Sequence, residues 1–507
     1  MPAFMKPVRA SGRGFSSRFL PPLLLRAVLL CAFLCPALPG GAQSLFTAPP
    51  EGSWIRGPAV LRISPGEDDE ESLPFMLIRT ETASGKRAML MGGAGLDLWG
   101  EPDEITHVRV EAYIEDKEGN RTSLGQTHFT LDPSTVYVSA VSGTGNGDGS
   151  RQRPLSTLDA ALALAESLGS NVIYLSGDVR LKDNVVLGGD LRLRGSYDTA
   201  WEKTAPLTIA FEEGASIRVR GGALTLEGVN LERRGVSGPV FHIETGGELK
   251  LREVSLVHNG MFALLDEGAV LAVEDSSVFS FSAAPRREAL VKSVNSRISI
   301  RGSAFSLEGN YGLMLEMSGG TLGITDSSFS ASCLRTGTVL SLSGVRSVFQ
   351  GAAFFVEAGD FASILEGKNS PFVIQNSTFR AGARDAVLVS LENEAQAASD
   401  DTPVFLDSAF TVASSFVAKA IEVRGFFPSV SGCSFIYAGN GRNSEIFSPV
   451  AEPHLKPRLP QPGFIGGNRF TAFHYIMGRE YPLDSLPAFN RIYAPQGRDN
   501  AAGGPPD

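Results

Sequence analysis

Cysteine and histidine are scarce in this chain. The 507 residues include four cysteines and six histidines. Cys31 and Cys35 lie in the N-terminal leader, which leaves Cys333 and Cys433 for the rest of the chain. The histidines are scattered, and His258, in 258-HNG-260, is interpreted as a turn residue. The sequence therefore offers neither a disulfide framework nor a cysteine–histidine metal motif.

Basic residues are also fewer than acidic residues. Lys and Arg number 45 against 55 Asp and Glu, a formal net charge of −10. Five of the basic residues lie within the first 42 positions, which contain no acid, so the remainder carries 40 against 55 and a net charge of −15. This excess argues against nucleic acid and anionic lipid as partners. It is compatible with neutral glycans, basic proteins or Ca²⁺.

Long apolar runs are absent beyond the N-terminal leader. The leader is basic, with Lys6, Arg9, Arg13, Arg18 and Arg26. An apolar run at 27–38, too short to cross a bilayer, precedes small residues at 40–42. We therefore expect 1–42 to be a signal peptide and the mature chain to be exported to the periplasm or the cell surface. The alternatives are an uncleaved anchor, or lipidation at Cys31 or Cys35, although both follow Leu rather than a small residue.

One six-residue phrase, in contrast, is abundant. It consists of an apolar residue, two turn-type residues, a small residue, a free position and a second apolar residue, as in 324-ITDSSF-329 and 374-IQNSTF-379. Its ten copies end at Leu231, Leu256, Val278, Phe305, Phe329, Phe354, Phe379, Phe410, Phe435 and Phe470. Successive ends lie 22 to 35 residues apart. A period of this length indicates a solenoid of stacked repeats.

Each copy predicts two short strands joined at a corner. In 247-GELKLREVSLVHNG-260, apolar residues alternate with polar ones before and after the corner, which is typical of strands with one buried face. Residues of turn type occupy the corners, for example Glu253, Gly302 and Asn376. Third strands are predicted upstream at 240–243, 262–265, 313–315, 387–389 and 421–423. Three strands in about 25 residues make one coil of a parallel β-helix, and variable loops after the third strand explain the uneven spacing.

Two columns of the phrase are interpreted as core. The last position is Phe in seven consecutive copies, from Phe305 to Phe470, which predicts an internal aromatic stack. The small position is Val, Ser, Ala or Cys in nine copies and Asn468 in the tenth, and small residues leave room for the rings. Cys433 belongs to this column and packs as a small hydrophobe. Cys333 lies four coils away, roughly 19 Å, beyond disulfide reach.

The segment 137–179 resembles the start of secreted right-handed parallel β-helix proteins of the pectate-lyase-like superfamily. A short strand and a Gly/Asn/Asp loop precede an amphipathic helix with Leu158, Ala161, Leu162, Ala165 and Leu168 on one face. Ser156 or Thr157 begins this helix, Gly169 ends it, and a first strand follows at 172–175. The resemblance covers 135–495 and implies an all-β, right-handed parallel β-helix of about ten or more coils. It implies little about activity.

The two ends of the chain are expected to differ from the coils. Aromatic residues in 471–495 predict a cap over the last coil, and 496–507 is predicted to be disordered. Strand patterns at 59–64, 75–80, 106–116 and 127–132 predict a small β-sandwich over 44–133. This region resembles bacterial Ig-like or chitobiase-C-terminal-type modules.

The sequence contains a weak candidate for catalytic chemistry. The outward position within the phrase carries no carboxylate in any copy. Just after the third strands, however, lie four acidic residues, Glu244, Asp266, Glu316 and Glu366. They are predicted to form an acidic row, with Lys292 between the second and third, where the resemblance implies Ca²⁺ and substrate binding in lyases. The favoured interpretation is that these four acids lie at a solvent-exposed corner of the coils and do not form a site. A second candidate Ca²⁺ site is the loop 143–150, through Asn146 and Asp148.

The favoured prediction is therefore an exported, monomeric, non-catalytic β-helix protein with a binding, adhesion or structural role. A glycan or a protein of a host or of the cell envelope is the expected partner, and no cofactor is required. The alternative is a Ca²⁺-dependent polysaccharide lyase or glycoside hydrolase. That alternative requires three or more of the four carboxylates to converge in a groove beside a Lys or Arg.

Overall fold

The structure is a computed structural model that describes residues 45–503 with gaps. The gaps are 57–58, 65–72, 83–84, 93–94, 99–104, 116–119, 133–134, 169, 234, 236–237, 283–286, 394–401, 442, 451–459, 461–463 and 479. The predicted signal peptide, with Cys31 and Cys35, lies outside the described residues. The chain divides into two compact units, which are described separately.

The N-terminal unit contains two small sheets. One is antiparallel and orders β1 (Leu45–Thr47), β3 (Ala59–Ser64) and β6 (Gly95–Leu98). The other orders β2 (Trp54–Arg56), β8 (Arg121–Asp132), β7 (Thr106–Glu115), β4 (Leu73–Thr82) and β5 (Gly85–Gly92). Burial alternates along β3 and β7, which gives each strand one apolar face. The four strands predicted from the sequence are confirmed, while β1, β2, β5 and β6 were not predicted.

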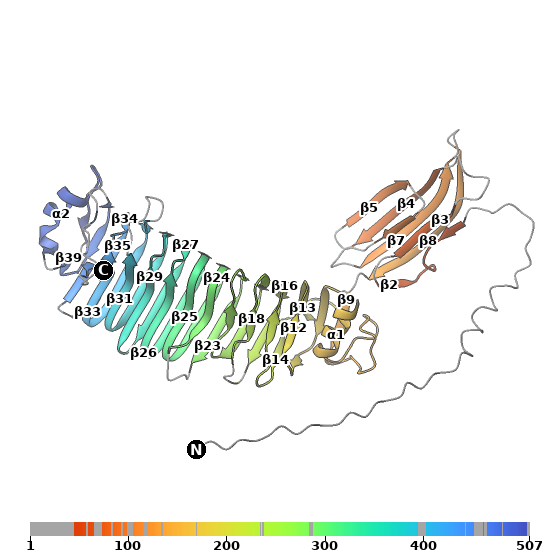
Figure 1. The fold of residues 1–507 in the computed structure, drawn as a ribbon, viewed down its shortest axis with the longest axis horizontal. Coiled ribbons are helices and arrows are strands. Elements are labelled where there is room, and N and C mark those ends of the chain that lie inside the picture. Colours follow the sequence, from red (N-terminus) through yellow and green to blue (C-terminus); the bar gives the residue numbers. More distant parts are fainter. Residues whose placement is uncertain are drawn as a thin grey trace, which may run out of the picture. The chain divides into compact units, whose positions relative to one another are not determined.

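The second unit is a parallel β-helix, as predicted, with its coils side by side (Figure 1). Sheet 1 leads into the corner of the repeated phrase through β9 (Thr135–Ser139), β10 (Val172–Ser176), β13 (Leu191–Tyr197), β16 (Gly222–Glu227), β19 (Gly247–Arg252), β22 (Val270–Glu274), β27 (Arg346–Gln350), β30 (Phe372–Gln375), β32 (Val404–Leu406), β34 (Ser429–Ser431) and β37 (Ile465–Gly466). Sheet 2 leaves the corner through β11 (Val179–Leu181), β14 (Leu207–Phe211), β17 (Val229–Arg233), β20 (Ser255–Asn259), β23 (Ser277–Ser282), β28 (Ala353–Ala358), β35 (Ser434–Tyr437), β38 (Arg469–Thr471) and β41 (Ala501–Ala502).

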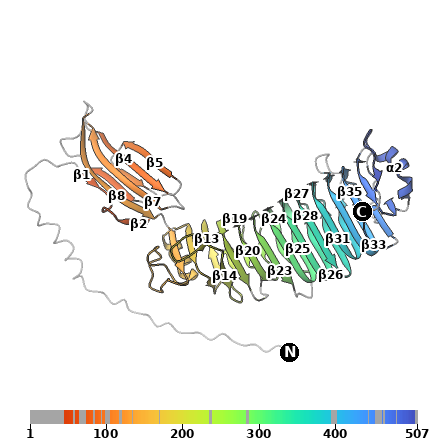
Figure 2. The same cartoon turned by 180° about the vertical axis from the view of Figure 1, so that it is seen from behind.

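Sheet 3 contains the predicted third strands, which are also confirmed. Its strands are β12 (Val185–Leu187), β15 (Ile217–Val219), β18 (Phe241–Ile243), β21 (Ala263–Leu265), β29 (Phe361–Lys368), β36 (Asn443–Pro449) and β39 (Tyr475–Met477). Five long strands bend from one sheet into the next, β24 (Ala289–Arg301), β25 (Ala304–Thr325), β26 (Ser328–Ser343), β31 (Thr378–Asn393) and β33 (Ala409–Gly425). Figure 2 shows the same coils from behind.

The corner between sheets 1 and 2 has left-handed backbone in most coils. Glu253, Gly302 and Asn376 all have positive φ, as predicted. Acidic residues and glycines alternate at several of these corners, and a Cβ on Gly302 would collide with the carboxylate of Asp275, one coil away. Because Glu253 and Asn376 adopt the same backbone conformation, it is the carboxylate of the neighbouring coil that requires glycine at Gly302.

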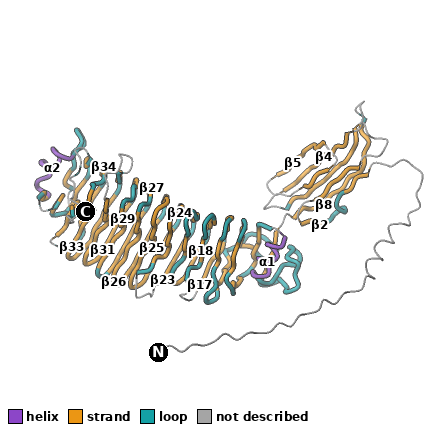
Figure 3. Tube along the Cα trace, in the orientation of Figure 1, coloured by secondary structure: helices purple, strands orange, loops and turns teal. Residues whose placement is uncertain are grey.

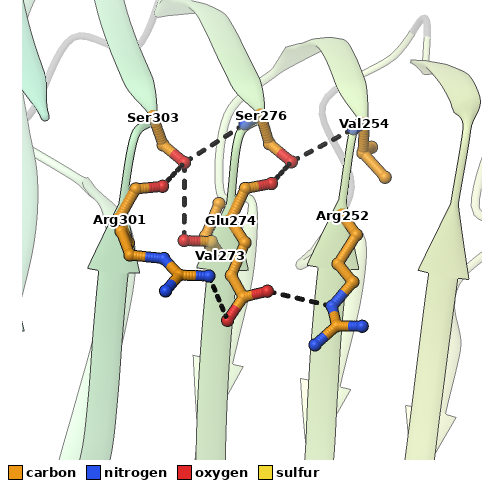
Figure 4. A network of polar contacts seen from close by, with 7 residues as sticks. All are labelled: Arg252, Val254, Val273, Glu274, Ser276, Arg301 and Ser303. Carbon is orange, nitrogen blue, oxygen red and sulfur yellow. Dashed lines mark hydrogen bonds and ion pairs between the residues drawn. The ribbon is translucent and has the colours of Figure 1, made fainter.

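The small column beside this corner is a hydrogen-bonded ladder, which the sequence analysis did not foresee (Figure 4). The backbone N–H of Ser276 donates to Oγ of Ser303 at 3.2 Å, and the N–H of Ser303 donates to Oγ of Ser327 at 3.1 Å. Each of these hydroxyls in turn donates to a carbonyl two residues earlier. The column thus gives the buried N–H groups of the corner an acceptor, besides leaving space for the rings.

The predicted aromatic stack is confirmed in the core. Ring centroids of successive coils lie 4.8–5.2 Å apart with nearly parallel planes from Phe305 to Phe435. The last pair, Phe435 and Phe470, is 5.7 Å apart and tilted by 54°. Offset stacking of this kind adds to the apolar burial of each ring.

Helices lie at both ends of the coils (Figure 3). Helix α1 (Leu158–Leu168) buries Leu158, Ala161 and Ala165, and Oγ1 of Thr157 accepts from the N–H of Ala160 at its start. Leu168 is 48% exposed, so its predicted place on the buried face is wrong. No helix among the described residues is both long and apolar enough to span a bilayer.

The C-terminal cap includes residues that were predicted to be disordered. Strand β40 (Tyr481–Pro482), a 3-10 turn (Leu483–Ser485) and α2 (Leu486–Tyr493) follow the last coil, and Phe489 is fully buried. Beyond them, β41 pairs with β38, and Asn500 is 4% exposed. Oδ1 of Asn500 accepts from the N–H of Asn468, the exceptional member of the small column. The described part of the tail therefore continues the ladder, because Asn offers the acceptor that Ser supplies elsewhere.

Replacing Ser303 with Ala tests the ladder. The change leaves the buried N–H of Ser276 without its acceptor, and we expect the free energy of unfolding to fall by about 1–3 kcal/mol. Chemical denaturation followed by circular dichroism measures the effect. Ser328→Ala, at an exposed position beside the corner of the next coil, is the control. Equal stability of the two variants would show that the serine column acts only as a spacer.

Candidate functional site

The predicted acidic row forms two rows on the outer face of sheet 3. In the first row Lys292, Glu316, Ser341 and Glu366 pair in register from coil to coil. Lys292 also pairs with Leu264, two residues before Asp266. Glu244 and Asp266 therefore belong to a second row, displaced by two residues along the strands. The four carboxylates do not converge, and the prediction of one continuous row is wrong.

Each of the four carboxylates has a basic or histidine partner. Glu244 lies 2.7 Å from Arg220 and 3.3 Å from Arg218, and the hydrogen bond from Arg220 is the main reason that the pKa of Glu244 lies below its usual value. The other three pairs are Asp266–His242 at 3.0 Å, Glu316–Lys292 at 3.6 Å and Glu366–Arg287 at 2.9 Å. The arrangement is one of alternating charge along the sheet.

In the loop predicted to bind Ca²⁺, the carboxylate of Asp148 contacts other residues of the loop. Oδ1 of Asp148 accepts from the N–H of Ser150 at 2.9 Å, and its other oxygen lies 3.7 Å from Arg153. Arg153 also donates to the carbonyl of Asn146. Asp148 therefore stabilises a turn and faces a cation. Across the described residues, no group of three or more His, Cys, Asp or Glu side chains is placed to hold a metal ion.

The better candidate site is a groove of about 590 Å³ on the outer face of sheet 3, towards the C-terminal coils. We call it the sheet 3 groove. Its walls combine charged side chains, hydroxyls and a few apolar groups, and include Ser341, Ser343, Phe361, Ser363, Glu366, Lys368, Val387, Ser390, Glu392, Glu422 and Arg424. Only Glu366 among the predicted site residues lies in it.

The charges of the sheet 3 groove are arranged in two adjacent rows. One row runs Glu366, Ser390, Glu422 and the other Lys368, Glu392, Arg424, each in strand register. Acids and bases of neighbouring coils face one another within the second row, and across the two rows Glu422 lies beside Arg424 of the same strand. Lys368 lies 2.7 Å from Glu392.

Glu422 is the most enclosed of these acids. It is 8% exposed, and it lies 2.7 Å from Nζ of Lys419 and 2.8 Å from Arg424. Ser363 lies nearby in the groove lining, where its hydroxyl is fully buried and has no hydrogen-bond partner. The groove thus contains closely paired charges and an unused hydroxyl.

The sequence analysis missed Glu392, Glu422, Lys368 and Arg424. Glu422 lies inside a predicted third strand, and Glu392 and Arg424 follow such strands closely. Reading the outward position of the strand 421–423 would have found Glu422, whereas Glu392 and Arg424 lie beyond the predicted strands. The register across coils could not be read, because the loops between them vary in length.

A second buried titratable group lies away from the groove. His258 belongs to β20 and is 1% exposed, so its interpretation as a turn residue is wrong. Burial lowers the pKa of His258 to about 4, and neither ring nitrogen has a hydrogen-bond partner. Arg233, its register partner in the preceding coil, is 2% exposed and adds a repulsive charge. His258 is therefore neutral in the folded chain at neutral pH.

Comparison with known proteins gives little beyond the fold. No family model and no curated protein matches the chain. A GH136 lacto-N-biosidase from Eubacterium ramulus is 10% identical with a TM-score of 0.25, covering 66% of this chain and 67% of the other. A tailspike protein of E. coli bacteriophage HK620 is 13% identical with a TM-score of 0.27, covering 71% and 62%.

The pectate lyase Pel3 from Pectobacterium carotovorum is 8% identical with a TM-score of 0.12, covering 72% of this chain and 89% of the other. At these values the likenesses carry no argument about activity. The function must be argued from the side chains of the chain itself.

Removing the charge of Glu422 tests the electrostatics of the groove. Glu422→Gln leaves Lys419 and Arg424 without their shared counter-charge, and we expect a loss of roughly 2–3 kcal/mol in the free energy of unfolding. Glu316→Gln is the matched control, because its side chain is 45% exposed and lies 3.6 Å from Lys292. It is expected to change stability by less than about 1 kcal/mol. Thermal and urea unfolding measure both, and equal effects would contradict the assigned geometry.

Because His258 is buried in its neutral form, we expect the stability of the fold to decrease in acid. Its folded pKa, about 4, lies below the ordinary value of 6.5, so the unfolded chain binds a proton more readily. The stability due to neutral His258 is full above about pH 6.5 and is lost as the pH falls towards 4, by up to about 3 kcal/mol. His258→Leu should flatten this part of the pH profile, whereas exposed His128→Gln should not. A parallel decline in both variants would refute the assignment.

Proposed function

We propose that this chain is an exported, non-catalytic binding protein whose β-helix holds a glycan in the sheet 3 groove. The observation that carries the proposal is the composition of that groove. Its carboxylates form ion pairs within the wall, and hydroxyls and a partly exposed ring lie beside them. These groups match a ligand that offers many hydroxyls and some apolar surface.

The polar groups of the groove suit hydroxyl recognition. Paired carboxylates retain lone pairs that accept from sugar hydroxyls, while Lys368 and Arg424 donate to them. Phe361 and Val387 supply apolar contact for a ring face. Few groups of this kind are needed to orient a ligand in a groove of this size.

The repeat favours an extended ligand. Equivalent side chains of neighbouring coils lie about 4.8 Å apart, and the groove spans the coils of β26, β29, β31 and β33. A chain of similar units that follows the coils meets comparable groups repeatedly. A compact small molecule would use only part of this row.

The competing function is a Ca²⁺-dependent polysaccharide lyase or glycoside hydrolase. The observation in its favour is that Glu366, Glu392 and Glu422 line one groove. Acid–base catalysis, however, needs carboxylates that exchange protons with substrate. Here a basic side chain lies within 2.9 Å of each carboxylate, so each one is engaged in an ion pair within the wall. The binding function requires no such exchange.

The remaining parts of the proposal concern location and assembly. A signal peptide over 1–42 would direct the mature chain, from Gln43, to the periplasm or cell surface. We infer that the N-terminal sheets form an Ig-like module that spaces the β-helix from its surroundings. A net charge of −15 after the leader favours a monomer, and a host or envelope protein is the alternative partner for the same surfaces.

The test uses the purified chain from Gln43 with neutral and acidic polysaccharides, with and without Ca²⁺. We expect retardation of the protein in gels that contain at least one glycan, and intact glycan by mass spectrometry. Phe361→Ala and Glu392→Gln should weaken retardation about tenfold or more. Phe355→Ala, on the outer face of sheet 2, is the control. Ca²⁺-dependent cleavage that Glu366→Gln abolishes would establish the competing enzyme, and no binding to any glycan would refute the proposal.

A further inference from the structure

A second groove lies at the N-terminal end of the β-helix, beside helix α1. It encloses about 760 Å³ between α1, strand β12 and the loops on either side of that strand. We call it the capping groove. Its lining includes Asp159, Leu162, Glu166, Asp183, Val186 and Asp190. It is distinct from the sheet 3 groove and shares no residue with it.

The capping groove exists because the helix covers the first coil incompletely. Helix α1 packs mainly against β9, β10 and β11. Strand β12 is the first strand of sheet 3 and pairs in parallel with β15 along one edge. Val186, at its centre, is 52% exposed, and Leu162 and Leu187 are only partly buried. An apolar strand at the end of a sheet is a site where another strand can add.

The rim of the capping groove is acidic. None of Asp159, Glu166, Asp183 and Asp190 forms an ion pair with a described residue, although Lys182 lies close enough to Asp159 to favour its charged form. Burial, together with the charge of Asp183, raises the pKa of Asp159. The acids of the sheet 3 groove, in contrast, have cations within 2.9 Å. The capping groove thus combines an excess of acidic side chains at its rim with the exposed apolar side chains of β12.

We propose that the capping groove binds a basic, amphipathic segment of a partner protein, which adds to β12 as an extended strand. Alternate side chains of such a strand point in opposite directions. Apolar residues on one face of the added strand can therefore cover Leu187 and Leu162, while Lys or Arg residues meet the acidic rim. Strand addition supplies backbone hydrogen bonds, and the alternating pockets supply specificity.

A second copy of the chain is a poorer occupant. The chain after the leader carries a net charge of −15, so approach of another copy to an acidic rim is electrostatically unfavourable. A basic partner gains from the same field, and its association should weaken with salt.

The experiment measures binding of a labelled eight-residue peptide of alternating Lys and Val to the chain from Gln43, by fluorescence anisotropy. We expect saturable binding that weakens at least tenfold in the triple variant Asp159→Asn, Glu166→Gln, Asp183→Asn. The control variant neutralises exposed acids of sheet 2, Glu308→Gln and Glu357→Gln, and should bind as the parent does. Circular dichroism and thermal unfolding confirm that each variant folds.

Two further peptides separate strand addition from simple charge attraction. A Lys–Ser peptide lacks the apolar side chains, and a Lys–Val peptide N-methylated along one edge cannot pair as a strand. Both should bind at least tenfold more weakly than the parent peptide. No binding of the Lys–Val peptide, equal binding of the Lys–Ser peptide, or no effect of the triple variant would overturn the proposal. So would a dimer in sedimentation experiments that Val186→Lys abolishes, because it would make a second copy the occupant.

Discussion

Every side chain of a coil in this β-helix lies about 4.8 Å from its counterpart in the next coil. This constraint decides which residues the repeat can hold. Inside, it favours residues that gain from being stacked, and the rings from Phe305 to Phe435 do so with centroids 4.8–5.2 Å apart. At the corner, hydroxyls repeat because each accepts from the N–H of the coil before it. The aromatic stack and the hydroxyl ladder thus run side by side through one continuous hydrophobic core.

The same constraint acts on charges outside. Identical charges stacked at one strand spacing repel, and several outer rows alternate in sign, such as Lys368, Glu392 and Arg424 on sheet 3. On sheet 1, Glu274 lies between Arg252 and Arg301, at 2.9 Å and 3.4 Å (Figure 4). On sheet 3 the alternation produces the paired acids of the sheet 3 groove. Charge pairing there is explained by the stacking of the coils, and the proposed binding function would use the surface that this stacking produces. The corner glycines beside Asp275 and Asp326 follow the same rule.

The fold could be predicted from the sequence because stacking makes the repeat visible. Strand positions, the corners with positive φ and the aromatic stack all follow from local patterns of a few residues. The groove could not be predicted, because it depends on register between coils, and some of its acids have partners far away in the sequence. Arg287, for example, lies 79 positions from its partner Glu366. His258 shows the other limit, since a polar residue followed by Asn and Gly suggests a turn, whereas here the strand continues through it. Asn468, the exception in the small column, was in fact the signal for its buried partner Asn500.

A coil at the end of a solenoid has a neighbouring coil on one side only. This difference distinguishes the capping groove, at an end, from the sheet 3 groove, within the stack. A coil in the middle has a neighbour on each side, so its charges and strand edges find partners within the chain. The first coil has a neighbour on one side, and its helix covers only part of it. At the other end, the tail supplies the missing partners: Asn500 accepts the hydrogen bond from the last member of the ladder, and β41 pairs with β38. No comparable segment among the described residues completes β12. Unpaired acids and an exposed apolar strand therefore remain together at the N-terminal end, where interactions with another molecule would offset what the chain does not satisfy internally.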